Sequence, residues 1–579
     1  MNREYLAELL DMAAGRIPAD LLIHNCRLVD VFNQELLDGP LAIGLGKVVG
    51  WGADYEARES LDAEGGIVIP GLVDGHVHIE SSSLTPAQFA RLVMPFGTTS
   101  IVADPHEIAN VCGLAGIRYM LEASRPLPLN VNIMLPSCVP ATPFERAGAV
   151  LTAADLETLM EEEGVLGLGE MMNFPGVINK DGDVLDKLLM ARKHHKPIDG
   201  HSPGLSGRGL TAYAAAGIST DHECGDLPSM KERLRLGLYV LMRLGSSAND
   251  LKELIKGLTP ANARRCVLCT DDREAADIMN TGHMNKLLRQ CVADGIDPLL
   301  AVTLGTLNAA ECFGLKGKGA LAPGWDADLA IVGDLKDFQV RRVLAAGREV
   351  ARDGRALFEA EDQAPAAVLN TVKLPPLNLE SFRLPLTGER VRALGNEANS
   401  IVTKSLALTV KRDEQGCFVP ALNPGLNKLA VIERHQASGR IGLGILAGYG
   451  LKDGALAVSV AHDSHNLIVV GDNDADMLAA AKAVEKMGGG YALVRGGGVL
   501  AELPLPVAGL MSERPAPEII AGLEKIIEAA HRDMGLAQDF HPLVNLIFQA
   551  LPVIPELKLT CDGLFDVSTF SLVDINITD

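Results

Sequence analysis

The sequence predicts an α/β protein in which a (β/α)8 barrel is inserted in a small β-sandwich and followed by a separate C-terminal α/β domain. At 579 residues, with 47% hydrophobic and 22% charged residues, the chain is globular in composition and too long for one hydrophobic core. In its first half, short apolar runs alternate with longer helical segments, which is typical of parallel βα units. Ionisable residues follow several of these runs, where barrel proteins carry their chemistry.

The elements that flank the barrel have a different pattern. Residues 3–15 form a predicted amphipathic helix, and the segment that follows alternates apolar and polar residues between turns, as in a small antiparallel sheet. Similar short strands return in "GALAPGWDADLAIV", and the Pro-rich "VKLPPLNLESFRLPL" marks a boundary. The predicted parts are residues 1–70 (helix and first part of the sandwich), 71–317 (barrel), 318–365 (return part of the sandwich) and 380–579 (C-terminal domain).

Charge and cysteine content limit the classes of partner. A net charge of -22 disfavours nucleic acid and anionic membrane surfaces, because both would repel the chain. The N-terminus lacks the apolar core of a signal peptide, and no run approaches the roughly 18 apolar residues of a membrane span. We therefore expect a cytoplasmic protein with reduced thiols and a small-molecule substrate. Cys266 and Cys269, in "CVLC", are predicted to lie on a buried strand.

The stretch "PGLVDGHVHIESS" carries His76 and His78 two positions apart. Residues two apart on a strand point to the same face, so both imidazoles can reach one metal ion at a barrel mouth. Gly75 lets the backbone bend or be approached closely just before them. The alternative is a strand end with two histidines that merely have hydrogen-bond partners.

Further ligand-type residues follow later strand-like runs in barrel order. Their recurrence favours a two-metal centre, because imidazole and carboxylate donors suit Zn, Fe or Mn. The predicted bridge is Glu170, since an anion shared by two cations lowers their mutual repulsion. The predicted metal ligands are His76, His78, Glu170, His201, His222 and Asp271.

These residues stand in strings that resemble the amidohydrolase superfamily of metal-dependent hydrolases. "PGLVDGHVHIESS", the later Glu, His, His and Asp, and the split sandwich all fit that superfamily. More narrowly, the chain resembles the bacterial adenine deaminases along essentially its whole length, including the C-terminal domain. The strings that carry this narrower resemblance are "TTSIVADPHEIANV", "GLGEMMNFPGV", "DGHSPGLSG", "STDHE", "CTDDR" and "ELPLPVAGLMS".

The resemblance implies hydrolytic deamination of a purine substrate, adenine, to hypoxanthine and ammonia. A hydroxide that bridges two divalent metal ions would attack C6. Mn(II) or Fe(II) is favoured, and Zn(II) also suits the donors. Glu170 would replace the carbamylated lysine of many relatives. Asp271 would be a ligand and also the base that passes a proton toward the leaving amine.

Other residues receive roles through the same resemblance. His106, in "ADPHEIAN", is assigned a catalytic role, and purine binding is assigned to Glu107, Asp272, Met511 and Ser512. For His106 and Glu107, proton shuttling and a structural cap remain open. Asp272 and Asp104 can equally cap the helices that follow them. Arg208 and His283 are predicted to lie on loops after barrel strands and are candidates for positions near the active site.

The C-terminal "VAHDSHNLIVVG" contains the turn His462-Asp463-Ser464-His465, which can bind a further metal, cover the site or simply be a solvated turn. "KMGGGYALVRGGG" predicts a tight hairpin, since it lacks the Lys-Ser/Thr of a phosphate-binding loop.

Two other classes of function compete with the deaminase. One is another amidohydrolase, such as an amino-sugar-phosphate deacetylase or a cyclic-amide hydrolase; the other is a non-catalytic relative. A non-catalytic relative is expected to lose metal ligands, and all six are present. A homo-oligomer is expected.

Overall fold

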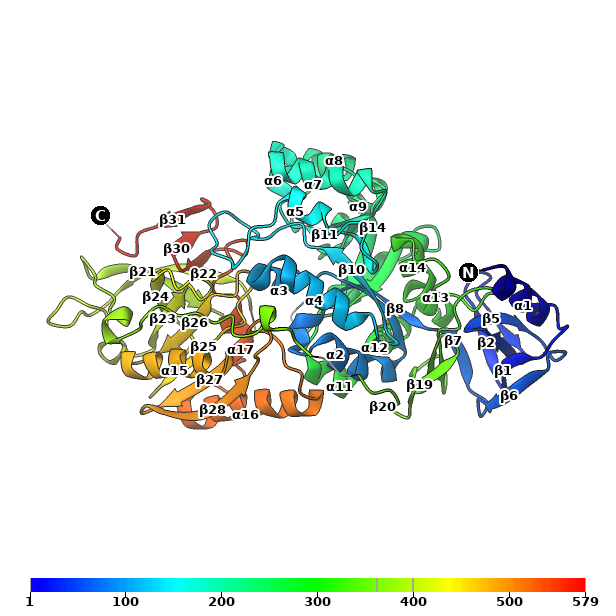
Figure 1. The fold of residues 1–579 in the computed structure, drawn as a ribbon. Coiled ribbons are helices and arrows are strands. Elements are labelled where there is room, and N and C mark those ends of the chain that lie inside the picture. The colour runs from blue at the N-terminus through cyan, green and yellow to red at the C-terminus, as the bar shows by residue number, and fades with distance from the viewer. Residues whose placement is uncertain (1, 247, 361–362, 398–399, 578–579) are drawn as a thin grey trace.

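The computed structural model describes residues 2–246, 248–360, 363–397 and 400–577. Figure 1 shows three parts side by side: the N-terminal sandwich at one end, the barrel in the middle, and the C-terminal domain at the other end.

The sandwich is built from both sides of the barrel insertion. Its second sheet joins β17 of the return segment to β7 of the opening segment in an antiparallel ladder, Leu329 opposite Pro70. Apolar residues of both sheets, including Ile23, Ile43 and Leu344, pack into one core. The first sheet, in spatial order, is β5 (Lys47–Trp51), β4 (Leu41–Gly44), β1 (Ala19–His24) and β6 (Ala57–Asp62), beside helix α1 (Arg3–Ala13). The second is β20 (Arg355–Ala356), β19 (Arg348–Arg352), β18 (Val340–Ala345), β17 (Leu329–Val332), β7 (Ile67–Pro70), β2 (Arg27–Asp30) and β3 (Glu35–Asp38).

The barrel strands follow one another around the ring in chain order, and their ladders are parallel. The ring closes where β16 pairs with β8. Strands β12 and β13 are joined by a backbone hydrogen bond in which Ser219 N, just before β13, donates to Ile198 O at 3.1 Å. The predicted barrel is therefore confirmed. The first seven strands are β8 (Leu72–His78), β9 (Thr98–Ala103), β10 (Asn130–Leu135), β11 (Val165–Met171), β12 (Ile198–Gly200), β13 (Thr220–Asp221) and β14 (Tyr239–Arg243). The eighth position is shared by β15 (Cys266–Cys269), which pairs with β14, and its continuation β16 (Asp271–Asp272), which pairs with β8.

The helices between the strands cover the barrel. Two of them begin where the side chains of Asp181 and Asp226 accept backbone N–H groups, as N-caps do. Residues of several barrel strands, such as Val73 and Leu241, pack with Phe313 of α14. The main helices are α2 (Pro86–Val93), α3 (His106–Cys112), α4 (Leu114–Ser124), α7 (Gly182–Lys193), α8 (Gly207–Ala215), α9 (Leu227–Arg235), α11 (Ala275–Thr281), α12 (Met284–Ala293), α13 (Pro298–Leu304) and α14 (Leu307–Phe313).

The C-terminal domain is a largely antiparallel sheet with helices packed against it. The predicted hairpin is confirmed, since β27 and β28 pair across Gly496 and Gly497, both with positive φ. The sheet, in spatial order, is β22 (Thr403–Thr409), β21 (Arg390–Asn396), β24 (Ile441–Ala447), β23 (Leu426–Ile432), β26 (Leu467–Gly471), β25 (Ala455–Val458), β27 (Gly490–Arg495) and β28 (Gly498–Pro504). Helices α15 (Asp474–Lys486), α16 (Ala516–Met534) and α17 (Pro542–Ile547) and strands β29 (Leu557–Thr560), β30 (Gly563–Asp566) and β31 (Ser571–Val573) complete it.

The C-terminal domain is joined to the loop after β8. Ser512 N donates to Ser83 O at 3.0 Å, and Thr85 N donates to Ser512 O at 3.3 Å. This contact holds the C-terminal domain against the barrel edge that carries the histidine pair. Within the described residues, no helix has the length and apolarity to cross a membrane.

Candidate metal centre and active site

Glu170, the penultimate residue of β11, lies at the centre of the ionisable cluster. Its Oε1 is 3.4 Å from His78 Nε2, whereas its Oε2 is 2.8 Å from His201 Nδ1 and 3.3 Å from His222 Nε2. The two carboxylate oxygens therefore face different groups of histidines. A carboxylate that bridges two cations needs this division.

The His76–His78 pair provides a test of whether a cation fits here. His76 Nδ1 lies 2.8 Å from Asp199 Oδ2, and His78 Nδ1 lies 2.9 Å from the Asp104 carbonyl, so each Nδ1 carries the proton that these acceptors require. The two Nε2 atoms then present lone pairs to each other at 3.1 Å. This arrangement is repulsive for neutral imidazoles alone and suits two ligands of one cation. The Asp199 and Asp104 contacts orient the rings as outer partners of metal-bound histidines do.

Asp271 divides its carboxylate in a similar way. Its Oδ1 lies 3.2 Å from His78 Nε2 and 3.8 Å from His76 Nε2, and its Oδ2 accepts a hydrogen bond from Arg243 Nη1 at 2.8 Å. Its φ of 58° is in the left-handed region, which costs a non-glycine residue energy and is held by the surrounding structure. The backbone is thus strained in the conformation that aims this carboxylate at the histidines.

The charges of the cluster favour ionised carboxylates. Burial alone would raise the pKa of the Asp271 carboxyl, but the contact with His78 and the charge of Arg243 hold that pKa well below its usual range. Burial would also raise the pKa of the Glu170 carboxyl, but its contacts with His201 and His222 hold that pKa well below its usual range. Both side chains are therefore available as anionic ligands.

Sequence reasoning missed Asp199, Glu223 and Arg243. Arg243 is the last residue of β14, and its guanidinium contacts Asp271, Glu223 and Asp250. Ionisable residues at the ends of barrel strands face the barrel mouth, and β14 is such a strand. The same rule could therefore have identified Arg243 as a site residue. Asp199 and Glu223 stand beside the assigned histidines in "IDGHS" and "TDHE".

His106 and Glu107, at the start of α3, extend the cluster. His106 Nδ1 is 3.3 Å from Glu170 Oε1, and His106 Nε2 is 3.3 Å from Glu107 Oε1. Glu107 in turn contacts the C-terminal residues His462 and His465. All these side chains are buried. The interpretation of the His-Asp-Ser-His segment as a solvated turn is therefore wrong.

The helix-cap alternatives for two aspartates are also wrong. Asp104 Oδ2 accepts the backbone N–H of Glu170 at 2.9 Å, and α3 has no side-chain cap. Asp272 accepts a hydrogen bond from Ser81 Oγ, and the residue at the N-cap of α11 is Glu274. Potential ligand atoms of Asp272, His78 and Asp271 lie within 4.8 Å of one another. Both aspartates thus serve the barrel mouth.

Four other candidates lie further from the cluster. Arg208 is exposed at the start of α8. His283 Nδ1 contacts Thr98 Oγ1 at 2.8 Å, at the opening residue of β9, and its Nε2 lies 3.4 Å from Asp74 Oδ2, two residues before His76. Met511 is buried, and Ser512 pairs with the loop after β8, but neither lines the cavity described next.

A cavity separates the barrel mouth from the C-terminal domain. The centre of a water molecule can occupy about 90 Å³ of this cavity. The barrel side contributes Glu80, Ser81 and Asp272. The C-terminal side contributes His462 and an apolar wall from α16, α17 and the residue after α17, consisting of Ile520, Leu523, Ile527, Leu543, Ile547 and Phe548.

A barrel of this kind, with histidines and carboxylates gathered at the ends of its strands, defines a metal-dependent hydrolase of the amidohydrolase class. The sequence model of the amidohydrolase family matches residues 67–350, and that of the adenine deaminase C-terminal domain matches residues 400–571. An adenine deaminase of Nitratidesulfovibrio vulgaris is 57% identical over 99% of this chain and 100% of its own length. Adenine deaminase 2 of Desulfotalea psychrophila is 45% identical over 99% of this chain and 100% of its own length. An adenine deaminase of Clostridium acetobutylicum is 43% identical over 98% of this chain and 100% of its own length. The chain belongs to the adenine deaminase family.

Proposed function

We propose that this protein hydrolyses adenine to hypoxanthine and ammonia. Membership of the adenine deaminase family supports the reaction. The observation that carries the mechanism is the division of Glu170 between His78 on one side and His201 and His222 on the other. In the overall reaction, the oxygen of water is added to C6 and the exocyclic amine leaves as ammonia, so one proton of the water must reach the amine and the other must reach ring N1.

Two divalent cations fit the donor set. His76 and His78 would hold one, His201 and His222 the other, with Glu170 shared between them and Asp271 as the remaining ligand. Bound cations of this kind acidify water and stabilise negative charge that develops on the substrate. Mn(II) or Fe(II) is our preferred identity, with Zn(II) also compatible with the donors.

Asp271 holds and moves the proton. Its Oδ1 lies on the side of the histidine pair, while Arg243 fixes Oδ2 and so prevents the carboxylate from turning away. An ionised carboxylate in this position accepts a proton at Oδ1 and returns it to the leaving amine. His106 is placed to donate or accept a proton at Nδ1, which lies 3.3 Å from Glu170 Oε1, while its Nε2 faces Glu107.

The cavity between the barrel and the C-terminal domain is our proposed purine site. None of the six proposed metal ligands lines it, and its link to the metal centre is Asp272, whose carboxylate lies within 4.8 Å of ligand atoms of His78 and Asp271. The apolar wall that includes Phe548 suits the ring face, and the polar groups of Asp272 and His462 suit the ring nitrogens.

The charges that line this cavity argue against an amino-sugar-phosphate deacetylase. Glu80, Asp272, Glu274 and Glu524 line the cavity, whereas the one Arg or Lys among its described lining residues is Arg273. The described lining of the cavity therefore lacks the cluster of basic side chains that would bind an anionic phosphate. A neutral purine needs no such cluster.

The test is an assay of metal-reconstituted protein with adenine, adenosine, guanine and cytosine, followed by ammonia release. We expect turnover of adenine and little or none of the other three. Absence of adenine turnover with each of Mn(II), Fe(II) and Zn(II) would contradict the proposal. Homo-oligomeric assembly and a cytoplasmic location remain predictions, which sedimentation and cell fractionation test.

A further inference from the structure

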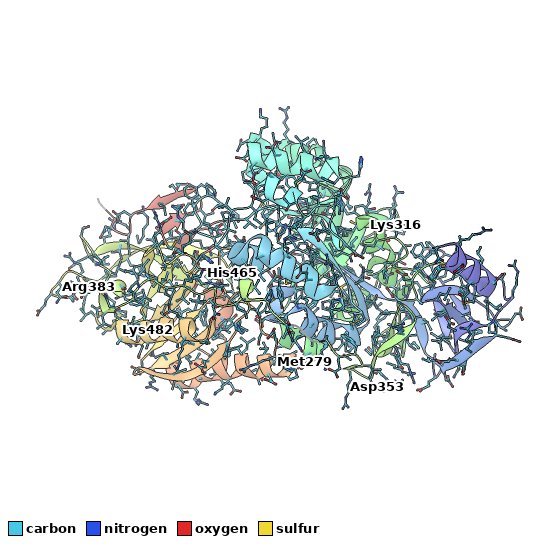
Figure 2. The ribbon with its side chains drawn as sticks, viewed as in Figure 1. Met279, Lys316, Asp353, Arg383, His465 and Lys482 are labelled. Atoms are coloured by element: carbon cyan, nitrogen blue, oxygen red, sulfur yellow. The ribbon has the colours of Figure 1, made fainter. Side chains whose placement is uncertain are left out.

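The side chain of Glu107 is held by the C-terminal domain, although Glu107 itself belongs to the barrel. His462 Nδ1 lies 2.5 Å from Glu107 Oε1, and His465 Nε2 contacts Glu107 Oε2. The two histidines are 355 and 358 residues further along the chain, between β25 and β26. Figure 2 places His465 beside α3, where the C-terminal domain meets the barrel. Both carboxylate oxygens are therefore engaged from the other domain.

The protonation of His465 follows from its second ring nitrogen. The backbone N–H of Ala461 donates to His465 Nδ1 at 3.0 Å, so Nδ1 carries a lone pair and the proton is on Nε2. His465 is thus a hydrogen-bond donor to Glu107. Burial lowers the pKa of His465 to about 4, which is consistent with a neutral ring in this tautomer.

The turn that carries these histidines is anchored on several sides. The fully buried Arg434 donates through Nε to the carbonyl of His465, and Asn466 Nδ2 donates to the Arg146 carbonyl of the barrel at 3.0 Å. The ring of His462 stacks on Phe548, with centroids 4.6 Å apart and planes 8° apart. A turn held in this way fixes the direction of the two imidazoles.

Glu107 connects the two C-terminal histidines to the metal centre through His106. Its Oε1 is 3.3 Å from His106 Nε2, and the other nitrogen of His106 is 3.3 Å from Glu170 Oε1. A rotated Glu107 carboxylate would leave His106 Nε2 without this partner. The orientation of His106 toward Glu170 therefore depends on residues of the C-terminal domain.

We propose that His465 and His462 are positioning residues, which act through Glu107 to orient His106 at the deaminase site. This inference rests on the proposed function. It assigns the C-terminal domain a part in the chemistry, in addition to closing the cavity.

The kinetic test compares H465F, which removes the donor, with H465Q, which keeps an N–H donor near the position of Nε2. We expect H465F to lower kcat about 10- to 100-fold, as loss of outer partners commonly does, with KM changed little and metal content unchanged. H465Q should recover most of the lost kcat. H531F, in α16 and away from Glu107, is the matched control and should behave as wild type.

A double-mutant cycle separates action through Glu107 from general damage. In an E107Q background, H465F should lower kcat no further, because the two residues act as one unit. The inference would be overturned if E107Q and H465F lowered kcat by independent factors that multiply in the double variant. It would also be overturned if H465F alone had the kcat of the wild type. If H465F does not fold, H462F gives the same comparison and keeps the ring stack on Phe548.

Crystal structures of H465F and H465Q test the positioning without any activity. The Glu107 carboxylate should turn in H465F and stay in place in H465Q. An unmoved carboxylate in H465F contradicts the inference even if adenine is turned over. A wild-type enzyme that does not deaminate adenine contradicts only the proposed function.

Discussion

At the residue scale, the site is built from side chains with two polar atoms, each of which has its own partner. His76 uses Nδ1 for Asp199 and leaves Nε2 for the centre, and Asp271 gives one oxygen to Arg243 and the other to the histidines. Glu170 divides its oxygens between two groups of histidines. Each outer contact fixes the direction of the inner atom, so no side chain has to be ordered when a cation or substrate arrives.

Replacing Glu170 tests the shared ligand. E170Q removes the negative charge while keeping the shape, so we expect metal content to fall at both positions and not at one. Elemental analysis of purified protein measures this directly. E163Q, at an exposed position of the barrel, is the matched control and should keep its metal. Wild-type metal content in E170Q would rule out the bridge.

Replacing Asp271 tests the proton carrier. D271N cannot accept a proton at Oδ1, and general-base catalysis contributes about 10²- to 10⁴-fold, so kcat for adenine should fall by that order. Steady-state kinetics measure the loss, with metal content determined in parallel. A D271N enzyme that keeps its metal and at least a tenth of its kcat would assign the proton transfer to another group.

At the element scale, strand ends were predictable and loop side chains were not. The apolar runs indicate where strands end, so His76, Glu170 and His201 could be chosen from the sequence. Asp104 and Asp272 also follow strands, but their carboxylates bond to Glu170 N and Ser81 Oγ instead of capping the next helix. Local sequence cannot distinguish these outcomes, because the partners come from other strands and loops.

Strand β8 offers a test of local packing beside the ligands. A Cβ on Gly75 would lie 2.7 Å from Val267 Cγ1 and 3.2 Å from the Leu268 carbonyl, and the β8–β9 register shifts between Asp74 and Val77. G75A should therefore cost about 1–3 kcal/mol of stability and displace His76. Thermal unfolding and metal affinity measure the two effects.

The control for that change is G182A, at the first turn of α7, where nothing lies within 4 Å of the added Cβ. It should be neutral or slightly stabilising, because alanine restricts the unfolded chain more than glycine. Equal losses in G75A and G182A would show that crowding against Val267 is unimportant.

At the scale of the whole molecule, the site belongs to two domains. The sequence predicts the C-terminal domain as a separate unit, and its hairpin is found, but no pattern in the chain links His465 to Glu107 across 358 residues. Such a contact depends on how two separately packed cores dock, which periodicity and turn signals do not encode. The docking contacts at Ser512 and Asn466 place the histidine turn over α3.

Domain stability should itself depend on pH through a lysine of the C-terminal domain. Lys558 is buried and donates to the carbonyls of Ile401 and Phe548, and burial lowers its pKa from 10.5 to about 7. Between these values the unfolded chain binds the extra proton, so stability rises as pH increases from about 7 toward 10.5. Below about pH 7 the lysine is charged in both states, and the full burial cost remains.

Replacing this lysine should remove that pH dependence. K558M loses two hydrogen bonds at every pH but no longer buries a charge, so its deficit relative to wild type should grow as pH rises from 7 to 10.5. The change should be on the order of 5 kcal/mol, because each pH unit between the two pKa values contributes about 1.4 kcal/mol. Thermal unfolding at several pH values measures it, with the exposed-site variant K452M as control. A constant difference between K558M and wild type would mean that Lys558 keeps an ordinary pKa in the folded protein.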